Sequence, residues 1–174
     1  MKGDIFCELQ CPKNDLEKKQ MDKIPYASAV GSIMYAKIYT QPDIAYVVGM
    51  LGRYQSNPGI DHWKADKKVL RYLQWTKDYM LTYKIINNLK IIGYYDSDYA
   101  GCKDTRKSTS GYIFMLSNGL ISWKSHKQSL IASSTMEIEY VACYEATCHA
   151  IWLKNYLRAS CYRFDNETID NILW

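Results

Sequence analysis

Residues 111–124 read GYIFMLSNGLISWK, and this stretch decides the fold class. Two runs rich in β-branched and aromatic residues, Gly111–Leu116 and Leu120–Lys124, flank Ser117-Asn118-Gly119. The pattern predicts a β-hairpin, and its Asn-Gly pair suits a type I′ turn.

More strands are expected on both sides of this hairpin. Met80–Ile86 and Lys90–Tyr95 are rich in the same residue types, and Asn87-Asn88 between them indicates another turn. Gln128–Ala132 is a candidate for a short further strand.

Helices are expected before and after the strands. Ser134-Thr135-Met136-Glu137 has the form of a capping box and predicts a long helix that ends near Leu157. Three earlier segments carry apolar residues at helical spacing: Tyr26–Ile38, Asp43–Tyr54 and Asp61–Thr76. Helices, then a strand meander, then a helix that packs on the sheet give an α+β fold.

Three regions are expected along the 174 residues. Residues 1–23 lack periodicity and predict an irregular arm, and residues 24–79 predict a helical segment. Residues 80–174 predict the sheet-containing domain. Its tail after Ala159 shows no periodic spacing of apolar residues.

The helix predicted at 61–76 carries a basic stripe. Trp63, Leu70 and Leu73 mark its apolar face. The stripe consists of Lys64, Lys67, Lys68 and Arg71. It is either a solvated face or a surface that contacts phosphates. Residues 1–89 also hold the whole charge excess, with 13 Lys/Arg against 9 Asp/Glu.

Composition excludes several classes of protein. The chain holds 16 Tyr and 5 Trp, whereas disordered chains are poor in aromatic residues. No apolar stretch reaches the ~18 residues of a membrane span, and the first residues lack a signal-peptide core. We therefore expect no membrane partner. The cysteines lack zinc-finger spacing, so we expect reduced thiols and an intracellular protein of the cytoplasm or nucleus.

Carboxylates point to a possible chemistry. Asp96 follows a predicted strand directly, and a buried carboxylate needs a hydrogen bond, an opposite charge or a metal ion. Glu137 and Glu139 lie in the first turn of the long helix, where the helix dipole alone can explain them.

Helical spacing favours a pair of Asp96 and Glu139. Ala142 and Ala146 follow Glu139 by three and seven residues, so this face can approach a strand closely. Such oxygen ligands bind Mg²⁺, and two ions ~3.5–4 Å apart hydrolyse phosphodiesters. Helix capping and surface charge are the alternative reading of both residues.

A series of motifs over about residues 8–158 resembles a known family. Three of them resemble the end of the reverse transcriptase in copia-type retrotransposon Pol polyproteins: YASAVGSIM (26–34), TQPDIAY (40–46) and RYQSNPG (53–59). Three more resemble the ribonuclease H domain that follows it: GYYDSDYA (93–100), RKSTSGYIF (106–114) and SSTMEIEYVA (133–142).

The resemblance implies a ribonuclease H-like mixed sheet with a packed helix, which cuts the RNA strand of RNA–DNA hybrids with two Mg²⁺ ions. It assigns Asp96 and Glu139 as catalytic, metal-binding residues. It implies as partners the hybrid, or other nucleic acid, and the rest of the Pol polyprotein. The candidate phosphate contacts, for which a solvated turn or face is the alternative, are Arg106, Lys107, Ser108, Thr109, Lys64, Lys68 and Arg71.

The sequence departs from the family pattern near its end. The family's third aspartate follows a further strand, and Phe164-Asp165-Asn166 imitates that motif without one, so Asp165 is not expected to bind metal. Since the third and fourth carboxylates are missing, we expect a truncated domain with impaired activity, one Mg²⁺ or none, and an open edge on the Asp96 strand. The alternatives are a non-catalytic nucleic-acid-binding module and a non-functional retroelement remnant.

Overall fold

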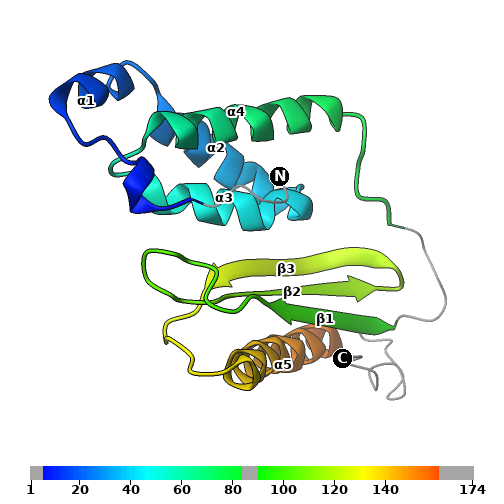
Figure 1. Cartoon of the computed structure of the whole chain (residues 1–174). Coiled ribbons are helices and arrows are strands. Elements are labelled where there is room, and N and C mark those ends of the chain that lie inside the picture. Colours follow the sequence, from blue (N-terminus) through cyan, green and yellow to red (C-terminus); the bar gives the residue numbers. More distant parts are fainter. Residues whose placement is uncertain (1–5, 84–89, 161–174) are drawn as a thin grey trace. The chain divides into compact units, whose positions relative to one another are not determined.

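The computed structural model describes residues 6–83 and 90–160, which belong to two compact units (Figure 1). Unit 1 holds the helices that precede Met80 together with the short segment Cys102–Arg106. Unit 2 holds the remaining described residues, which include the whole sheet and the last helix.

Unit 1 is built from helices, and η marks a 3₁₀ turn among them. Their bounds are η1 Glu8–Gln10, α1 Asp15–Met21, α2 Tyr26–Tyr39, η2 Pro42–Ile44, α3 Ala45–Leu51, η3 Gly52–Tyr54 and α4 Ile60–Trp75. The predictions of α2 and α4 are confirmed. The helix predicted over Asp43–Tyr54 is instead an α-helix with a 3₁₀ turn at each end, and Pro42 opens the first turn, where its missing N–H costs nothing.

The arm at the start of the chain contains a helix that the sequence pattern did not predict. The Asn14 side chain caps α1 by accepting the Glu17 N–H at 2.9 Å. A helix of seven residues is too short to display a repeat, so this cap was the available signal.

The core of unit 1 lies between α2, α3 and α4. Tyr26 and Val30 of α2 pack with Leu51 of α3 and Val69 of α4, and all four are at most 1% exposed. The Tyr26 hydroxyl donates to the Leu51 carbonyl at 2.9 Å, which satisfies its buried oxygen.

The buried face of α4 matches the predicted one in part, since Trp63 and Leu73 pack against the core as expected. Leu70 is 40% exposed, while Ala65 and Val69 are buried together with His62 and Asp66. Small side chains let helices pack closely, so the helix turns Ala65 and Val69 inward and leaves the larger Leu70 at the surface.

Unit 2 is a three-stranded antiparallel sheet with one long helix on one of its faces (Figure 1). Its elements are β1 Ile91–Ser97, β2 Thr109–Leu116, β3 Gly119–Lys127 and α5 Thr135–Ser160, and the strand order is β1-β2-β3. The α+β class is confirmed. The expected mixed sheet is antiparallel throughout its three described strands.

The predicted hairpin forms with its turn shifted by one residue. Ser117 and Asn118 have φ of 50° and 68°, and Leu116 pairs with Gly119. Positive φ at both central residues defines a type I′ turn, so Ser117-Asn118 rather than Asn118-Gly119 occupies its centre. A register shift between Phe114 and Met115 absorbs the difference.

Two other predicted strands are absent from the described residues. Residues 80–83 are not in a strand, and the rest of Met80–Ile86 lies outside the described residues. Gln128–Ala132 is irregular and not a strand. The buried side-chain amide of Gln128 donates to Ser110 Oγ at 2.6 Å and to the Ile138 carbonyl at 3.1 Å. It therefore ties β2 to the start of α5.

The long helix packs on the sheet through small side chains. Ala146, Ala150 and Leu153 of α5 form a buried cluster with Tyr112 and Phe114 of β2. The predicted cap is confirmed, since the Glu137 N–H donates to Ser134 Oγ at 3.3 Å. The Glu137 carboxylate accepts the N–H of Ser133, one residue before the cap.

Two expectations concern the chain as a whole. No helix of the described residues is long and apolar enough to cross a membrane. The free thiols in this part of the chain are those of Cys7, Cys11, Cys102, Cys143 and Cys148, and Cys161 lies outside it.

The close approach of the arm to α4 gives a test of unit 1. A Cβ at Gly59 would lie 1.7 Å from the Gln10 carbonyl oxygen, so we expect Gly59→Ala to cost about 1–3 kcal/mol by overpacking. Gly31, inside α2, has open space around it, and Gly31→Ala should stabilise by about 0.5–1 kcal/mol. Urea denaturation of both variants measures the difference, and equal effects would contradict the packing described.

Candidate functional site

Asp96 lies near the end of β1 and is exposed. Its Oδ1 accepts the N–H of Ser97 at 2.8 Å. Side chains alternate along a strand, so Asp96 and its neighbour Tyr95 point to opposite faces of the sheet. Tyr95 packs against the cluster that α5 covers, which directs Asp96 to the other face.

Glu139 lies in the second turn of α5 and is also exposed. Ala142 is buried on this helix, as expected. The first residue of the buried stripe is Ile138, and Glu139 lies next to that stripe on the helix surface. The pKa of the Tyr95 hydroxyl is raised, first by burial, then by Cys143 and last by the charge of Glu139, so the Glu139 carboxylate lies within electrostatic range of Tyr95.

The charge of Glu139 therefore acts on Tyr95, the residue that precedes Asp96. Among the described residues it shows no hydrogen bond between the two carboxylates and no group of three or more side chains that could hold a metal ion. The oxygen donors of Asp96 and Glu139 suit Mg²⁺ by type, whereas their number is too small for a two-metal centre. Asp165 lies outside the described residues.

Asp98, the other acidic residue of the motif, has a structural role. Its backbone N–H donates to the Thr109 carbonyl at 3.0 Å, and its carboxylate accepts the Thr109 N–H. A Cβ at Gly101 would lie 1.9 Å from Asp98 Oδ2, so a side chain there would displace the Asp98 carboxylate. These contacts hold the ends of the β1–β2 loop together.

The predicted phosphate contacts of this loop fall into two classes. Arg106 is exposed and Lys107 is half-buried. Ser108 and Thr109 are 1% and 6% exposed, and Ser108 Oγ accepts the Ala100 N–H at 3.1 Å. Burial keeps both hydroxyls from a phosphate, so Arg106 and Lys107 are the residues of this group that remain accessible.

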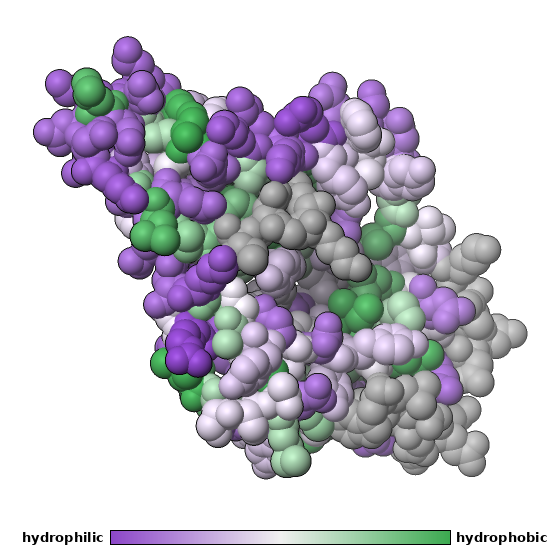
Figure 2. All heavy atoms as spheres, viewed as in Figure 1, coloured by the Kyte–Doolittle hydropathy of each residue, from purple (hydrophilic) through white to green (hydrophobic). Residues whose placement is uncertain are grey.

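The basic stripe lies on the exposed face of α4. Lys64, Lys67, Lys68 and Arg71 are all exposed, and Figure 2 shows hydrophilic residues gathered over α1 and along α4. Lys64 Nζ lies 3.0 Å from Asp61 Oδ1, and Lys67 Nζ lies 5.7 Å from the centre of the Trp63 ring. Arg71 Nε donates to the Lys67 carbonyl at 3.3 Å.

Two buried polar residues on the opposite side of α4 were not singled out from the sequence. His62 Nδ1 accepts the Gly59 N–H at 2.9 Å, so the neutral ring carries its proton on Nε2. Burial lowers the pKa of His62 and raises the pKa of Asp66 to about 6. Within the described residues, His62 Nε2 and both oxygens of Asp66 make no hydrogen bond. An i, i+4 pair of polar residues inside an amphipathic helix was the available signal.

A serine–histidine pair in unit 2 was also not predicted. Ser122 Oγ of β3 lies 2.7 Å from His149 Nε2 of α5. The His149 ring stacks on Tyr112 at 4.9 Å and on Trp152 at 5.4 Å, and burial lowers its pKa. The stacking on Tyr112 and Trp152 indicates that this pair joins β3 to α5 as packing.

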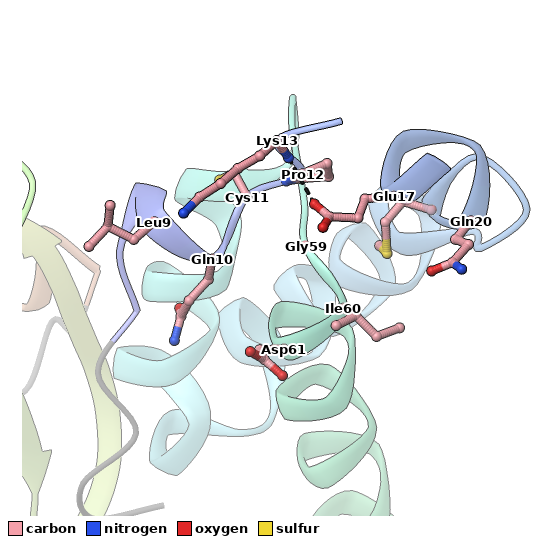
Figure 3. Close-up of a pocket in the computed structure, with 11 residues that line it drawn as sticks. Leu9, Gln10, Cys11, Pro12, Lys13, Glu17, Gln20, Gly59, Ile60 and Asp61 are labelled. Atoms are coloured by element: carbon pink, nitrogen blue, oxygen red, sulfur yellow. Dashed lines mark hydrogen bonds between the residues drawn. The ribbon is translucent and has the colours of Figure 1, made fainter. Parts of the chain in front are cut away.

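A pocket of about 440 Å³ lies in unit 1, between the segment Leu9–Lys13 and the start of α4 (Figure 3). Its acidic groups already have partners within the chain. Glu17 Oε2 accepts the Lys13 N–H at 2.8 Å, and Asp61 pairs with Lys64. None of the predicted site residues lines this pocket.

The chain is similar to several known proteins. It is 47% identical over 148 residues to the retrovirus-related Pol polyprotein from transposon TNT 1-94 of Nicotiana tabacum, which covers 85% of this chain and 11% of that protein. It is 39% identical over 135 residues to the Pol polyprotein from transposon RE2 of Arabidopsis thaliana, covering 78% of this chain and 9% of that protein.

A shorter relative matches over nearly its whole length. The secreted RxLR effector protein 161 of Plasmopara viticola is 49% identical over 133 residues, which cover 76% of this chain and 94% of that protein. No family model matches the chain, and no solved structure matches it.

The buried carboxylate of Asp66 generates a test by pH. Since the folded state raises its pKa from 3.8 to about 6, the free energy of unfolding falls as the pH rises through this interval. We expect Asp66→Asn to exceed the parent chain in stability by about 3 kcal/mol at pH 7, and to match it below pH 4.

Urea denaturation of the full chain at both pH values measures this difference. Asp22→Asn, at an exposed position after α1, is the matched control and should change stability by less than about 0.5 kcal/mol. A gain for Asp66→Asn that is independent of pH would contradict the assignment.

Proposed function

This chain belongs to the retrovirus-related Pol polyproteins of copia-type transposons. We propose that it consists of the end of a reverse transcriptase followed by a ribonuclease H-like domain that acts on nucleic acid. The chain spans about a tenth of the length of the Pol polyproteins it matches. The observation that carries the proposal is the 47% identity to one of them over 148 residues.

In this proposal unit 2 is the ribonuclease H-like part. The intact polyprotein hydrolyses the RNA strand of RNA–DNA hybrids, and Asp96 and Glu139 are the carboxylates that this chain contributes. Mg²⁺, bound by carboxylates of this kind, would supply an activated water and stabilise the leaving oxygen. The place of both residues in the family-like motifs supports this assignment, whereas in the described structure Glu139 lies within electrostatic range of Tyr95 and Asp96 points to the opposite face of the sheet.

Catalysis by these two carboxylates alone is expected to be weak. Two Mg²⁺ ions carry four positive charges, and two carboxylates neutralise only half of them. The absence of a three-ligand group among the described residues therefore favours a second candidate function, a module that binds nucleic acid without cutting it.

Binding is proposed to depend on α4. The stripe places four exposed cations on one helix face, and phosphates attract such a row through charge and through the release of counterions. The exposed Arg106 adds a further cation in unit 1. These contacts carry no base specificity, which suits a protein that must act along a whole hybrid.

The catalytic part of the proposal predicts a Mg²⁺-dependent cleavage that is slow or undetectable. Any cleavage of the RNA strand of a labelled 20-base-pair hybrid should disappear in Asp96→Asn and in Glu139→Gln, since each removes an oxygen ligand's charge. Gel electrophoresis of the products measures it. Cleavage that persists in both variants would exclude this site.

The binding part predicts a loss specific to the stripe. The triple variant Lys64→Ala, Lys68→Ala, Arg71→Ala should bind the hybrid more weakly and reduce the slope of log K against log salt by about 2–3. Fluorescence anisotropy at several salt concentrations measures both quantities.

The matched control removes three exposed lysines elsewhere in unit 1. Lys18→Ala, Lys19→Ala, Lys23→Ala changes the net charge by the same amount on and just after α1. Equal losses in the two triple variants would show a general charge effect and would contradict a binding surface on α4.

A further inference from the structure

Trp75, the last residue of α4, is the most exposed of the large apolar side chains in the described part of the chain. Its exposed fraction is 84%. Keeping a tryptophan in water forgoes roughly 2–3 kcal/mol that burial would provide. Among the described residues no aromatic ring stacks on it, so a flat apolar surface faces the solvent at the end of this helix.

Trp75 continues the basic stripe. Lys64, Lys68, Arg71 and Trp75 follow one another at intervals of four, three and four residues, which places them on one face of the helix. The buried Ala65 and Val69 fix the rotation of α4, so this face is the one turned to solvent.

The surroundings of Trp75 favour an anionic partner over an apolar one. Neither acidic residue of α4 would repel an anionic partner, since Asp61 pairs with Lys64 and Asp66 is buried on the other side of the helix. A shallow hollow of about 410 Å³ runs along the same face and is lined by Lys67, Leu70, Arg71 and Gln74. A protein partner that covered Trp75 with apolar residues would also bury these cations without a counter-charge, which is costly.

A partner that combines a row of negative charges with flat apolar rings is single-stranded nucleic acid. We propose that Trp75 stacks on an unpaired base of a single strand, whose phosphates lie along Lys64, Lys68 and Arg71. This inference rests on the proposed nucleic-acid function and extends it. The stripe from residue 64 to residue 75 is about 16 Å long, so it can follow several phosphates of one strand.

The proposal separates single strands from blunt duplexes. An unpaired base offers its face to an indole, whereas the bases of a blunt hybrid are already stacked on one another. Trp75 should therefore add affinity for a single strand beyond the charge attraction that both ligands share. Stacking tolerates any base, so RNA and DNA strands should both bind.

The test measures anisotropy of fluorescein-labelled 20-mers of dT and rU, and of a blunt RNA–DNA hybrid, with the full chain. Trp75→Ala should weaken binding of both single strands by about 5- to 150-fold and leave the hybrid within about twofold. Trp75→Phe should retain most of the affinity because it keeps a ring. The slope of log K against log salt should not change, since no cation is removed.

A matched control is Trp152→Ala, which removes another exposed tryptophan, 56% exposed on α5, and should leave all three affinities unchanged. An equal loss on single strands and hybrid, or a loss in Trp152→Ala as large as in Trp75→Ala, overturns the stacking role. So does a change in oligomeric state of Trp75→Ala without any change in affinity.

Failure of this inference is distinct from failure of the proposed function. If Trp75→Ala binds like the parent chain while the triple variant of the basic stripe binds weakly, the proposed nucleic-acid binding is supported and the stacking role of Trp75 is excluded. If the parent chain binds none of the three ligands, both fall.

Discussion

The rotation of α4 about its own axis is the constraint on which the proposed nucleic-acid surface depends. Ala65 and Val69 are small enough to pack between α2 and α3, and His62 accepts the N–H of Gly59 at the start of the helix. These inward contacts leave one orientation for the helix. In that orientation the cations of the stripe and Trp75 share the solvent face, although none of them contributes to the core.

A comparable constraint acts in unit 2. Alanines at 142, 146 and 150 are buried, so α5 lies close to the sheet, and the charge of Glu139 reaches Tyr95 of β1. The alternation of the strand then directs Asp96 to the face away from α5. The described packing therefore does not join the carboxylates of Asp96 and Glu139, and the proposed cleavage depends on ligands beyond these two.

Elements with a long, regular pattern could be predicted from the sequence, and those set by single contacts could not. The spacing of α2, α4 and α5 and the alternation of β2 and β3 indicated these elements correctly. The hairpin turn is centred on Ser117-Asn118, one residue earlier than predicted, together with a register shift between the strands. Gln128 is not in a strand, and its side chain bonds Ser110 and Ile138 instead. Leu70 was expected inside and lies outside, because smaller residues packed in its place. Asp96 and Glu139 were favoured by the end of a strand and by helical spacing, and the family resemblance then assigned both, whereas the basic stripe followed from helical spacing.

The nucleic-acid surface on α4 can be mapped by amide chemical-shift changes when a blunt RNA–DNA hybrid is added to the full ¹⁵N-labelled chain with Mg²⁺. A hybrid-binding surface on α4 predicts the largest shifts between residues 64 and 71, with smaller shifts near Asp96 and Glu139. Shifts confined to the pocket beside Leu9–Lys13, or shifts spread evenly over both units, would contradict it.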